Sequence, residues 1–279
     1  MTPPRPVVPV RPVRVTDLPK ESTDLLHAYA TDPEGVFAAG PDGPPPVGLA
    51  AGVVRGDVLQ VVHLEVARAA RGKGTGPALW NAVRAYGAAR GAHSVEFARS
   101  ADEATLGFLL GTGLPVRGLA LRLRATALRP SAGSPLPLAP LPPGVPLSGW
   151  VADLDRETRG FPRGVDWSYW ARSGTDLYAA RRRGRPEGLG ALTLAGRQAL
   201  LGPVAAARPE AAAQVFLALA AEAFGRGAKE IDSVLPSEAR FLVTEALRAG
   251  FRLAGSFPVL GGRLRGDLRR YAASPTSFF

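Results

Sequence analysis

The stretch Val58–Pro77, VLQVVHLEVARAARGKGTGP, decides how the first half of this chain folds. Val58–Val66 is a run of apolar and β-branched residues typical of a strand. Arg71–Gly76 is a glycine-rich loop, and Pro77 after it suits the first turn of a helix. Glycines let a backbone approach a ligand closely, and the unpaired amides of a helix start point toward an anion. The stretch therefore predicts a strand, a loop able to hold a pyrophosphate, and a helix.

Two common phosphate-binding loops are excluded by the order of residues. Lys73 precedes the last glycines, so no G-x-x-x-x-G-K-[ST] loop is present. After Gly74 and Gly76 the third position of a G-x-G-x-x-G loop is Leu79. On these residues alone, a glycine-rich turn that merely links a strand to a helix stays open as the alternative.

The surrounding sequence predicts antiparallel strands followed by strand–helix–strand units in each half, which indicates a mixed α/β (α+β) sheet. In the first half, Asp17–Thr31 and Pro77–Arg90 are expected to be helical, with strands at Val36–Ala39, Val47–Val54, Val58–Val66, Ser94–Ala98 and Leu119–Arg124. In the second half, Pro209–Arg226 is expected to be helical, with strands at Leu177–Arg181, Gly188–Leu194, Ala199–Val204, Ile231–Leu235 and Leu253–Leu260.

The two halves resemble each other at an offset near 136 residues. Gly91–Glu96 has its counterpart in Gly227–Asp232, each following an amphipathic helical run. Between the halves, residues 130–146 contain seven prolines, which favours a semi-rigid spacer rather than part of a sheet. The pattern predicts a duplication, with domains at residues 1–129 and 147–279 joined by the linker 130–146.

Composition bounds the class of protein. With 279 residues and 46% apolar side chains, the chain can bury a large core. It lacks cysteine, a signal-peptide core and an apolar run long enough to span a membrane, so a cytoplasmic location is expected. The net charge of +10 invites a nucleic-acid partner. However, only Lys20, Lys73 and Lys229 among 34 basic residues are lysines, and this arginine bias favours a GC-rich genome as its origin.

Together, Leu64-x-Val66, Arg71-x-x-Gly74-x-Gly76 and the following helix–strand–helix pattern ending at Gly113-Leu114 resemble the GNAT superfamily of N-acetyltransferases. The motif is intact in residues 10–125, and only the layout recurs in 147–260, as in tandem members with a degenerate second copy. The resemblance implies an acetyl-CoA-dependent transfer of an acetyl group to an amine on a small molecule or peptide. It also implies the cofactor-binding residues: Leu64, Glu65 and Val66 for the pantetheine arm, and Arg71, Gly72, Lys73, Gly74, Thr75 and Gly76 for the pyrophosphate.

The second half departs from this pattern. The strand Leu201–Val204 is followed by Ala205–Pro209 and Glu210, without glycines. Glu210 places a negative charge where a pyrophosphate would lie, so this half is not expected to bind acetyl-CoA in the same way.

No catalytic residue follows from the sequence. Many family members place a tyrosine, as general acid, where this chain has Leu109 and, in its second half, Ala246. Glu65 and His63 lie on a common face of their strand and are candidate bases; an ion-paired glutamate and a packing histidine are the alternatives. The missing tyrosine leaves open a rival function, a catalytically weak or inactive module that binds acyl-CoA or nucleic acid. The three histidines have no metal-ligand spacing, so no metal is expected.

The segment from Pro146 to Arg172 is the candidate for an acceptor-binding wall. Its aromatic cluster (Phe161, Trp167, Tyr169 and Trp170) could line a pocket, or could simply pack in a core. Its four carboxylates could attract an amine cation: Asp153, Asp155, Glu157 and Asp166. Alternatively, they pair with the neighbouring Arg156, Arg159 and Arg163.

Overall fold

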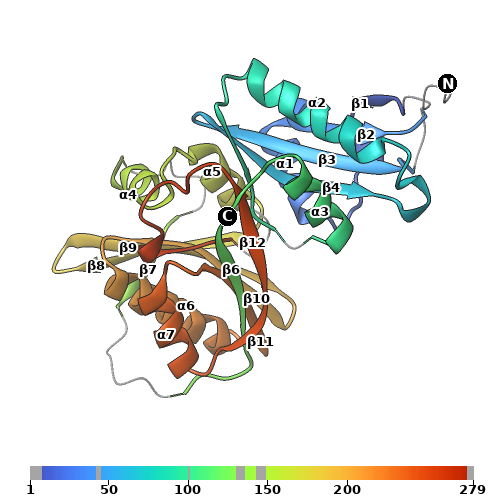
Figure 1. Ribbon diagram of the computed structural model, residues 1–279. Coiled ribbons are helices and arrows are strands. Elements are labelled where there is room, and N and C mark those ends of the chain that lie inside the picture. The colour runs from blue at the N-terminus through green and yellow to red at the C-terminus, as the bar shows by residue number, and fades with distance from the viewer. Residues whose placement is uncertain (1–7, 42–44, 100, 130–135, 143–148, 275–279) are drawn as a thin grey trace, which may run out of the picture. The chain divides into compact units, whose positions relative to one another are not determined.

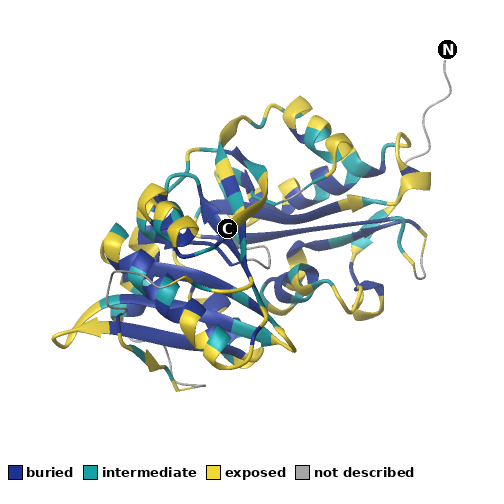
Figure 2. Cartoon of the chain, turned by 90° about the horizontal axis from the view of Figure 1, so that it is seen from below, coloured by how far each residue is buried: buried dark blue, intermediate teal, exposed yellow. Residues whose placement is uncertain are grey.

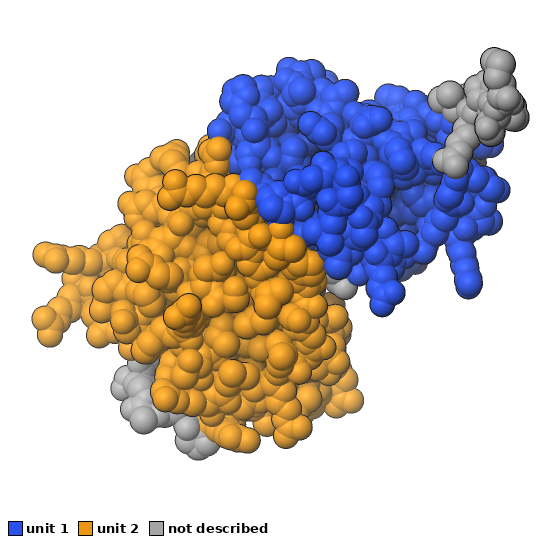
Figure 3. Space-filling view, in the orientation of Figure 1, with its two compact units in different colours: residues 1–115, 260–262 blue, residues 116–259, 263–279 orange. Residues whose placement is uncertain are grey.

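The computed structural model describes residues 8–41, 45–99, 101–129, 136–142 and 149–274 of the chain. The protein has a mixed α/β fold that divides into two compact units (Figure 3). Unit 1 comprises Met1–Pro115 with Leu260–Gly262, and unit 2 comprises Val116–Val259 with Arg263–Phe279. The short segment Leu260–Gly262 thus belongs to unit 1 although it lies near the end of the sequence.

In unit 1 the strands follow one another in the order β1-β2-β3-β4-β5, and the end of β12 lies next to β5. All neighbours are antiparallel except β4 and β5, which are parallel. The elements are β1 (Val10–Pro12), α1 (Thr23–Thr31), β2 (Val36–Ala39), β3 (Gly48–Arg55), β4 (Val58–Val66), α2 (Thr75–Ala89), β5 (Ser94–Phe97), α3 (Glu103–Gly111) and the last residues of β12 (Arg252–Gly261).

Helix α2 packs its apolar stripe against these strands. Leu79, Trp80 and Val83 are buried, as the spacing of apolar residues along one helix face requires. They share one core cluster with strand residues such as Leu59 and with Leu109 of α3. Figure 2 shows the outcome, with buried strands and helices whose outer faces are exposed. The cluster fixes the start of α2 close to the end of β4 and to α3.

Strand β5 pairs with only the first part of β4. Their parallel pairing covers Val58–Val61 against Ser94–Phe97, whereas β4 continues to Val66. On the other side, β4 remains paired with β3 to its end, with a bulge where Ala51 pairs with His63 and Gly52 with Val61. The last five residues of β4 therefore present backbone groups on the side where β5 has left.

In unit 2 the strand order is β12-β6-β11-β10-β9-β8-β7, with β13 beside β10. The elements are β6 (Val116–Ala125), β7 (Leu138–Pro140), α4 (Gly149–Arg159), α5 (Gly164–Arg172), β8 (Thr175–Arg182), β9 (Arg185–Ala195), β10 (Gln198–Ala206), α6 (Pro209–Gly225), β11 (Glu230–Pro236), α7 (Arg240–Arg248), β12 and β13 (Tyr271–Ala272). A short 3₁₀ turn, η4 (Leu268–Arg270), precedes β13.

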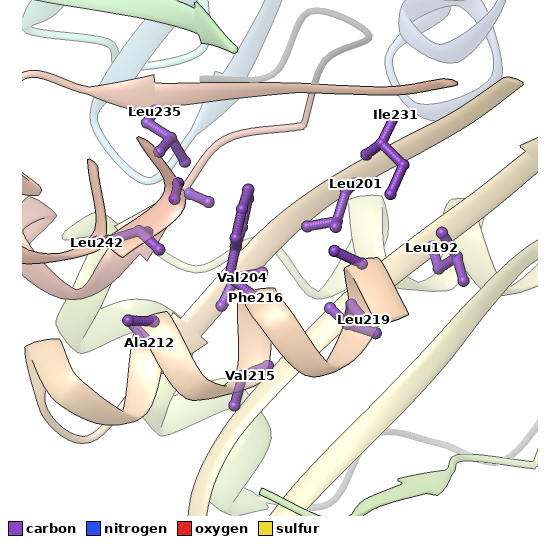
Figure 4. Packing of buried hydrophobic residues seen from close by; sticks show 14 of the residues in the cluster. Leu192, Leu201, Val204, Ala212, Val215, Phe216, Leu219, Ile231, Leu235 and Leu242 are labelled. Carbon is purple, nitrogen blue, oxygen red and sulfur yellow. The ribbon is translucent and has the colours of Figure 1, made fainter. Parts of the chain in front are cut away.

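The core of unit 2 lies between its sheet and the alanine-rich helix α6. Val215, Phe216 and Leu219 of α6 share one buried cluster with Val204 and Leu201 of β10 (Figure 4). Helices α6 and α7 cover this face of the sheet, and α4 and α5 cover the other (Figure 1). Small side chains along α6 let the helix lie close to the strands. No helix in the described part of the chain is long and apolar enough to cross a membrane.

Most of the expected helices and strands are present, with ends within a few residues of those predicted. However, the strand expected at Leu119–Arg124 as the last strand of the first half belongs to unit 2. Strand β6 pairs with β11 of unit 2, Ile231 opposite Ala125. The place beside β5 is taken by Leu260 and Gly261. Alternation predicts which residues form a strand but not which strand becomes its neighbour. The compact units divide at Pro115, whereas the sequence predicts domains at 1–129 and 147–279.

The expectation that the whole proline-rich stretch is a spacer was wrong for residues 136–142. Leu138–Pro140 forms β7, which pairs with β8 at the edge of the sheet. Leu141 donates its amide to the carbonyl of Leu177 at 2.7 Å, and Leu136 is buried. An edge strand needs donors on one side only, so it tolerates proline. Residues 130–135 and 143–146 of the stretch lie outside the described residues.

Candidate functional site

A pocket of about 300 Å³ lies in unit 1 where β4, the glycine-rich loop and α3 meet. Six of the nine residues expected to bind a cofactor line it: Leu64, Val66, Arg71, Gly72, Gly74 and Gly76. Pro77 of α2 and three residues of α3 complete the wall: Ala104, Thr105 and Phe108. The pocket thus joins the open end of β4 to the start of α2.

The loop takes a backbone path that glycine makes possible. Gly72 and Gly74 have φ angles of 73° and 87°, in the left-handed region that other residues rarely adopt. Gly74 is the N-cap residue of α2, and a side chain there would point into open space. The amides of the first helical turn have no carbonyl partner within the helix. Those of Thr75 and Gly76, with the positive end of the helix dipole, form a setting suited to an anion.

Arg71 ties the loop to the elements on either side. Its Nε donates to the carbonyl of Val66 at 3.0 Å, and its guanidinium forms an ion pair with Asp102 at 2.8 Å. Asp102 caps α3 by accepting from the amide of Thr105 at 2.8 Å. The hydrogen bonds from Thr105, together with Arg71, hold the pKa of Asp102 below its usual value. Arg71 thus both lines the pocket and fixes its shape.

The other three expected residues do not line the pocket. Thr75 is buried and its hydroxyl donates to the carbonyl of Ala70 at 3.2 Å. Lys73 is exposed on the loop. The side chain of Glu65 is 73% exposed, and its Oε2 lies 3.5 Å from Nε2 of His63. This contact confirms that Glu65 and His63 share one face of β4.

His63 is neutral at physiological pH. Burial, assisted by the charge of Arg99, lowers its pKa to about 3. Nη1 of Arg99 lies 3.2 Å from Nδ1 of His63, and a guanidinium can only donate. Nδ1 is therefore the acceptor, and the ring proton sits on Nε2, facing Glu65. In this state His63 offers a donor at Nε2 and no free lone pair there.

Sequence reasoning missed Arg99, which occupies the opening beside β4. Its Nη1 donates to the carbonyl of Val62 at 2.6 Å and to Asp24 of α1 at 2.6 Å. Val62 is the first residue of β4 beyond the ladder with β5. A basic residue two positions after β5 was the only available signal, and in a chain so rich in arginine that signal carries little weight.

None of the described residues that line the pocket is a tyrosine. Leu109 and Ala246, the positions considered for a general acid, are fully buried apolar residues. Tyr86 lies on α2, and burial together with Asp32 raises the pKa of its phenol. It is not among the residues that line the pocket.

Three of the four carboxylates expected to form an acidic wall at residues 146–172 are paired with arginines. Asp155 forms a buried ion pair with Arg163. Asp153 pairs with Arg156 at 3.0 Å, and Glu157 pairs with Arg270 at 3.2 Å. Residues 146–148 lie outside the described part of the chain. Pairing of these three carboxylates within unit 2 was the alternative to attraction of an amine cation, although Glu157 pairs with Arg270 and not with a neighbour in sequence.

Three of the four aromatic residues of the same segment, Phe161, Trp167 and Trp170, are buried in a core, which was the alternative interpretation, and Tyr169 is half-buried. Trp167 and Trp170 are 1% and 4% exposed, and their rings meet edge to face at 5.2 Å. Phe161 is buried under the guanidinium of Arg159. These contacts explain the cluster without a ligand.

Comparison with known proteins agrees with this geometry. Residues 9–111 match the profile of the Acetyltransferase (GNAT) family, and these residues contain the loop and all ten residues that line the pocket. No curated protein matches the chain by sequence.

Solved structures show that the fold is that of GNAT proteins. A candidate acetyltransferase from Pyrococcus horikoshii superposes with a TM-score of 0.73 at 18% identity, covering 91% of this chain and 83% of that one. A tandem GNAT protein from the clavulanic acid biosynthesis pathway has a TM-score of 0.58 at 14% identity, covering 81% and 82%. A GCN5-related N-acetyltransferase from Sphaerobacter thermophilus has 0.58 at 15%, covering 93% and 98%.

Proposed function

We propose that unit 1 binds acetyl-CoA and transfers its acetyl group to an amine of a small molecule or peptide. The observation that carries the proposal is the pocket itself, bounded by the end of β4 that has no pairing with β5, the glycine loop and α3. Gly72–Gly76 and the start of α2 would hold the pyrophosphate, and Leu64–Val66 would lie along the pantetheine arm. The family match over residues 9–111 supports the same assignment.

We also propose that the chain is a tandem pair whose second copy is degenerate. In unit 1 β4 and β5 pair in parallel over four residues, and in unit 2 β10 and β11 do the same, Gln198–Leu201 against Glu230–Ser233. The loop before α6 has no glycine, and Arg208 in it is paired with Glu187 at 2.8 Å. The same arrangement of elements thus supports duplication, and the altered loop supports loss of the pyrophosphate site.

The transfer needs a new N–C bond, cleavage of the C–S bond and removal of one proton from the amine. Acetyl-CoA supplies the activated acetyl group; when the C–S bond breaks, coenzyme A leaves as a thiolate, which takes up one proton from water and so balances the proton removed from the amine. Of the two candidate bases, the geometry favours Glu65, because Nε2 of His63 already carries a proton. Glu65 is exposed and can accept the proton directly or through a water. His63 faces Glu65 and would orient it.

The proposal is tested by isothermal titration calorimetry with acetyl-CoA. Gly74→Glu places a carboxylate at the N-cap of α2, and we expect binding to weaken at least tenfold through repulsion of the pyrophosphate. Gly91→Glu is the matched control. Gly91 also has a left-handed φ (79°) and open space around it, but it lies at the far end of α2. Equal affinity of wild type and Gly74→Glu would show that the loop is not the site.

A second candidate function is a catalytically weak module that binds acyl-CoA or nucleic acid. The observation that favours it is the apolar residue at both tyrosine positions, Leu109 and Ala246. The two candidates differ in thiol release, which only the enzyme produces in the presence of a panel of amines. DNA affinity that falls steeply with salt, without thiol release, would select the module.

A further inference from the structure

Unit 2 repeats the strand arrangement that opens the pocket of unit 1, but a segment of the chain itself fills the opening. After its four paired residues β10 continues to Ala206 without β11. Along this stretch β10 pairs instead with β13, Val204 opposite Ala272 and Ala205 opposite Tyr271. Because β9 occupies the other edge of β10, β13 lies on the side that β11 has left.

The segment Leu268–Ala273, which we term the C-terminal insert, reaches every wall of this space. Its first turn, η4, contacts α6, α7 and β10. These elements correspond to α2, α3 and β4, which line the pocket of unit 1. At its other end the amide of Ala273 donates to the carbonyl of Val234 in β11 at 2.9 Å. The insert thus spans the opening between β10 and β11.

Buried side chains anchor the insert. Tyr271 and Ala272 are fully buried and Leu268 is 4% exposed. Nη1 of Arg163, itself buried and paired with Asp155, donates to the hydroxyl of Tyr271 at 2.8 Å. This contact holds the ring within unit 2.

The backbone of β10 is shaped for the insert as well. Gly202 has a φ of 128°, and a Cβ there would collide with the carbonyl of Ala273. At the loop before α6, Nη1 of Arg270 donates to the carbonyl of Ala207 at 3.0 Å. An arginine of the insert therefore lies where the other unit presents its anion-binding loop.

We infer that the groove of unit 2 is a peptide-binding groove, which the C-terminal insert occupies in the position corresponding to the cofactor arm in unit 1. A peptide and a pantetheine arm both carry amides that can pair with the free edge of a strand. The chain consequently binds one acetyl-CoA, and the groove of unit 2 recognises an extended peptide with a tyrosine anchor. The assignment of the cofactor to unit 1 rests on the proposed function, whereas the peptide groove does not.

The test removes the insert and returns it as a separate molecule. A chain ending at Asp267 is titrated with a fluorescent peptide of residues 266–279, and thermal unfolding is followed with and without it. We expect a lowered unfolding midpoint, restored by the peptide, with one-to-one binding. The same peptide with Tyr271→Ala should bind at least tenfold more weakly. The full chain, with its groove filled, should not bind the peptide. An unchanged midpoint without peptide binding would overturn the inference.

Two measurements on the intact chain keep the test decisive if the shortened chain does not fold. Hydrogen exchange should show the amide of Ala273 protected to the same degree as those of β10, and rapid exchange there would contradict the insert. Calorimetry should give one acetyl-CoA per chain, and a stoichiometry of two would also contradict it. If no acetyl-CoA binds but the insert is protected and the peptide binds, the proposed function fails and the peptide groove stands.

Discussion

At the scale of single residues, the environment of His63 shows how a titratable group is held neutral. The ring is buried on β4 and receives a hydrogen bond from a permanently charged guanidinium. Both effects oppose protonation and lower the pKa of His63 to about 3. His63 therefore carries no charge in the pH range where a transferase works, and an ionisation seen near pH 6.5 in a rate profile would belong to another group.

The shift of His63 has a consequence for stability. Its pKa is depressed from 6.5, so between pH 6.5 and 3 the unfolded chain binds the extra proton. The contribution to stability is complete above pH 6.5 and is lost as the pH falls, by up to about 1.4 kcal/mol per pH unit. His63→Asn keeps an acceptor for Arg99 but does not titrate. Urea unfolding at pH 4 to 7 should show the wild type losing stability more steeply than this variant, and parallel profiles would contradict the burial of a neutral imidazole.

Glu65 provides the second prediction at this scale. Glu65→Gln keeps the size of the side chain and removes the proton acceptor. We expect kcat to fall at least a hundredfold with an acetyl-CoA Kd within twofold of wild type, since general bases contribute about 10²–10⁴ to rates. A stopped thiol-release assay measures kcat, and calorimetry measures the Kd for acetyl-CoA. A loss of affinity with unchanged kcat would assign Glu65 to binding and leave the base elsewhere.

At the scale of elements, α3 depends on its first turn for both its stability and its place in the pocket wall. The carboxylate of Asp102 caps α3 by accepting a hydrogen bond from the amide of Thr105. Removing such a cap lowers the free energy of unfolding by about 1 kcal/mol. Asp102→Ala should lower the thermal midpoint by about 2–4 °C, whereas Asp102→Asn retains the cap and should change it little. Differential scanning calorimetry of both variants checks the difference. If both variants lowered the thermal midpoint equally, the stabilising interaction would be the ion pair between Asp102 and Arg71, which both variants remove, and not the cap.

The elements also show what the sequence could and could not predict. Periodicity identified β4 and α2 almost to the residue, because alternation and helical spacing are local properties. The glycines of the loop predicted the pocket's position, since left-handed backbone there needs glycine. The partners of β6 and β12 were not predictable, because their pairing is decided by distant segments. For the same reason Arg99, placed by contacts to β4 and α1, was not identified in advance.

At the scale of the whole molecule, the two compact units share the sequence in an unusual way. Unit 1 needs Leu260 and Gly261 to pair with the edge of β5, and unit 2 needs β6 to pair with β11. Each half of the sequence therefore supplies a strand to the unit built mainly by the other half. An isolated fragment 1–129 would expose the edge of β5 and keep β6 without its partner, which favours aggregation.

This exchange predicts how the protein responds to a single cut. A protease site inserted within residues 130–135 allows the chain to be cleaved between β6 and β7. We expect the two fragments to co-elute from a size-exclusion column in native buffer and to separate only in denaturant, because each fragment carries a strand of the other's sheet. A matched cut between Gly91 and Ala92 falls within unit 1 and should lower the acetyl-CoA affinity, whereas the cut at 130–135 should not. Separation of the fragments in native buffer would mean that the exchanged strands contribute too little to hold them together, and that residues 1–129 and 147–279 behave as independent domains.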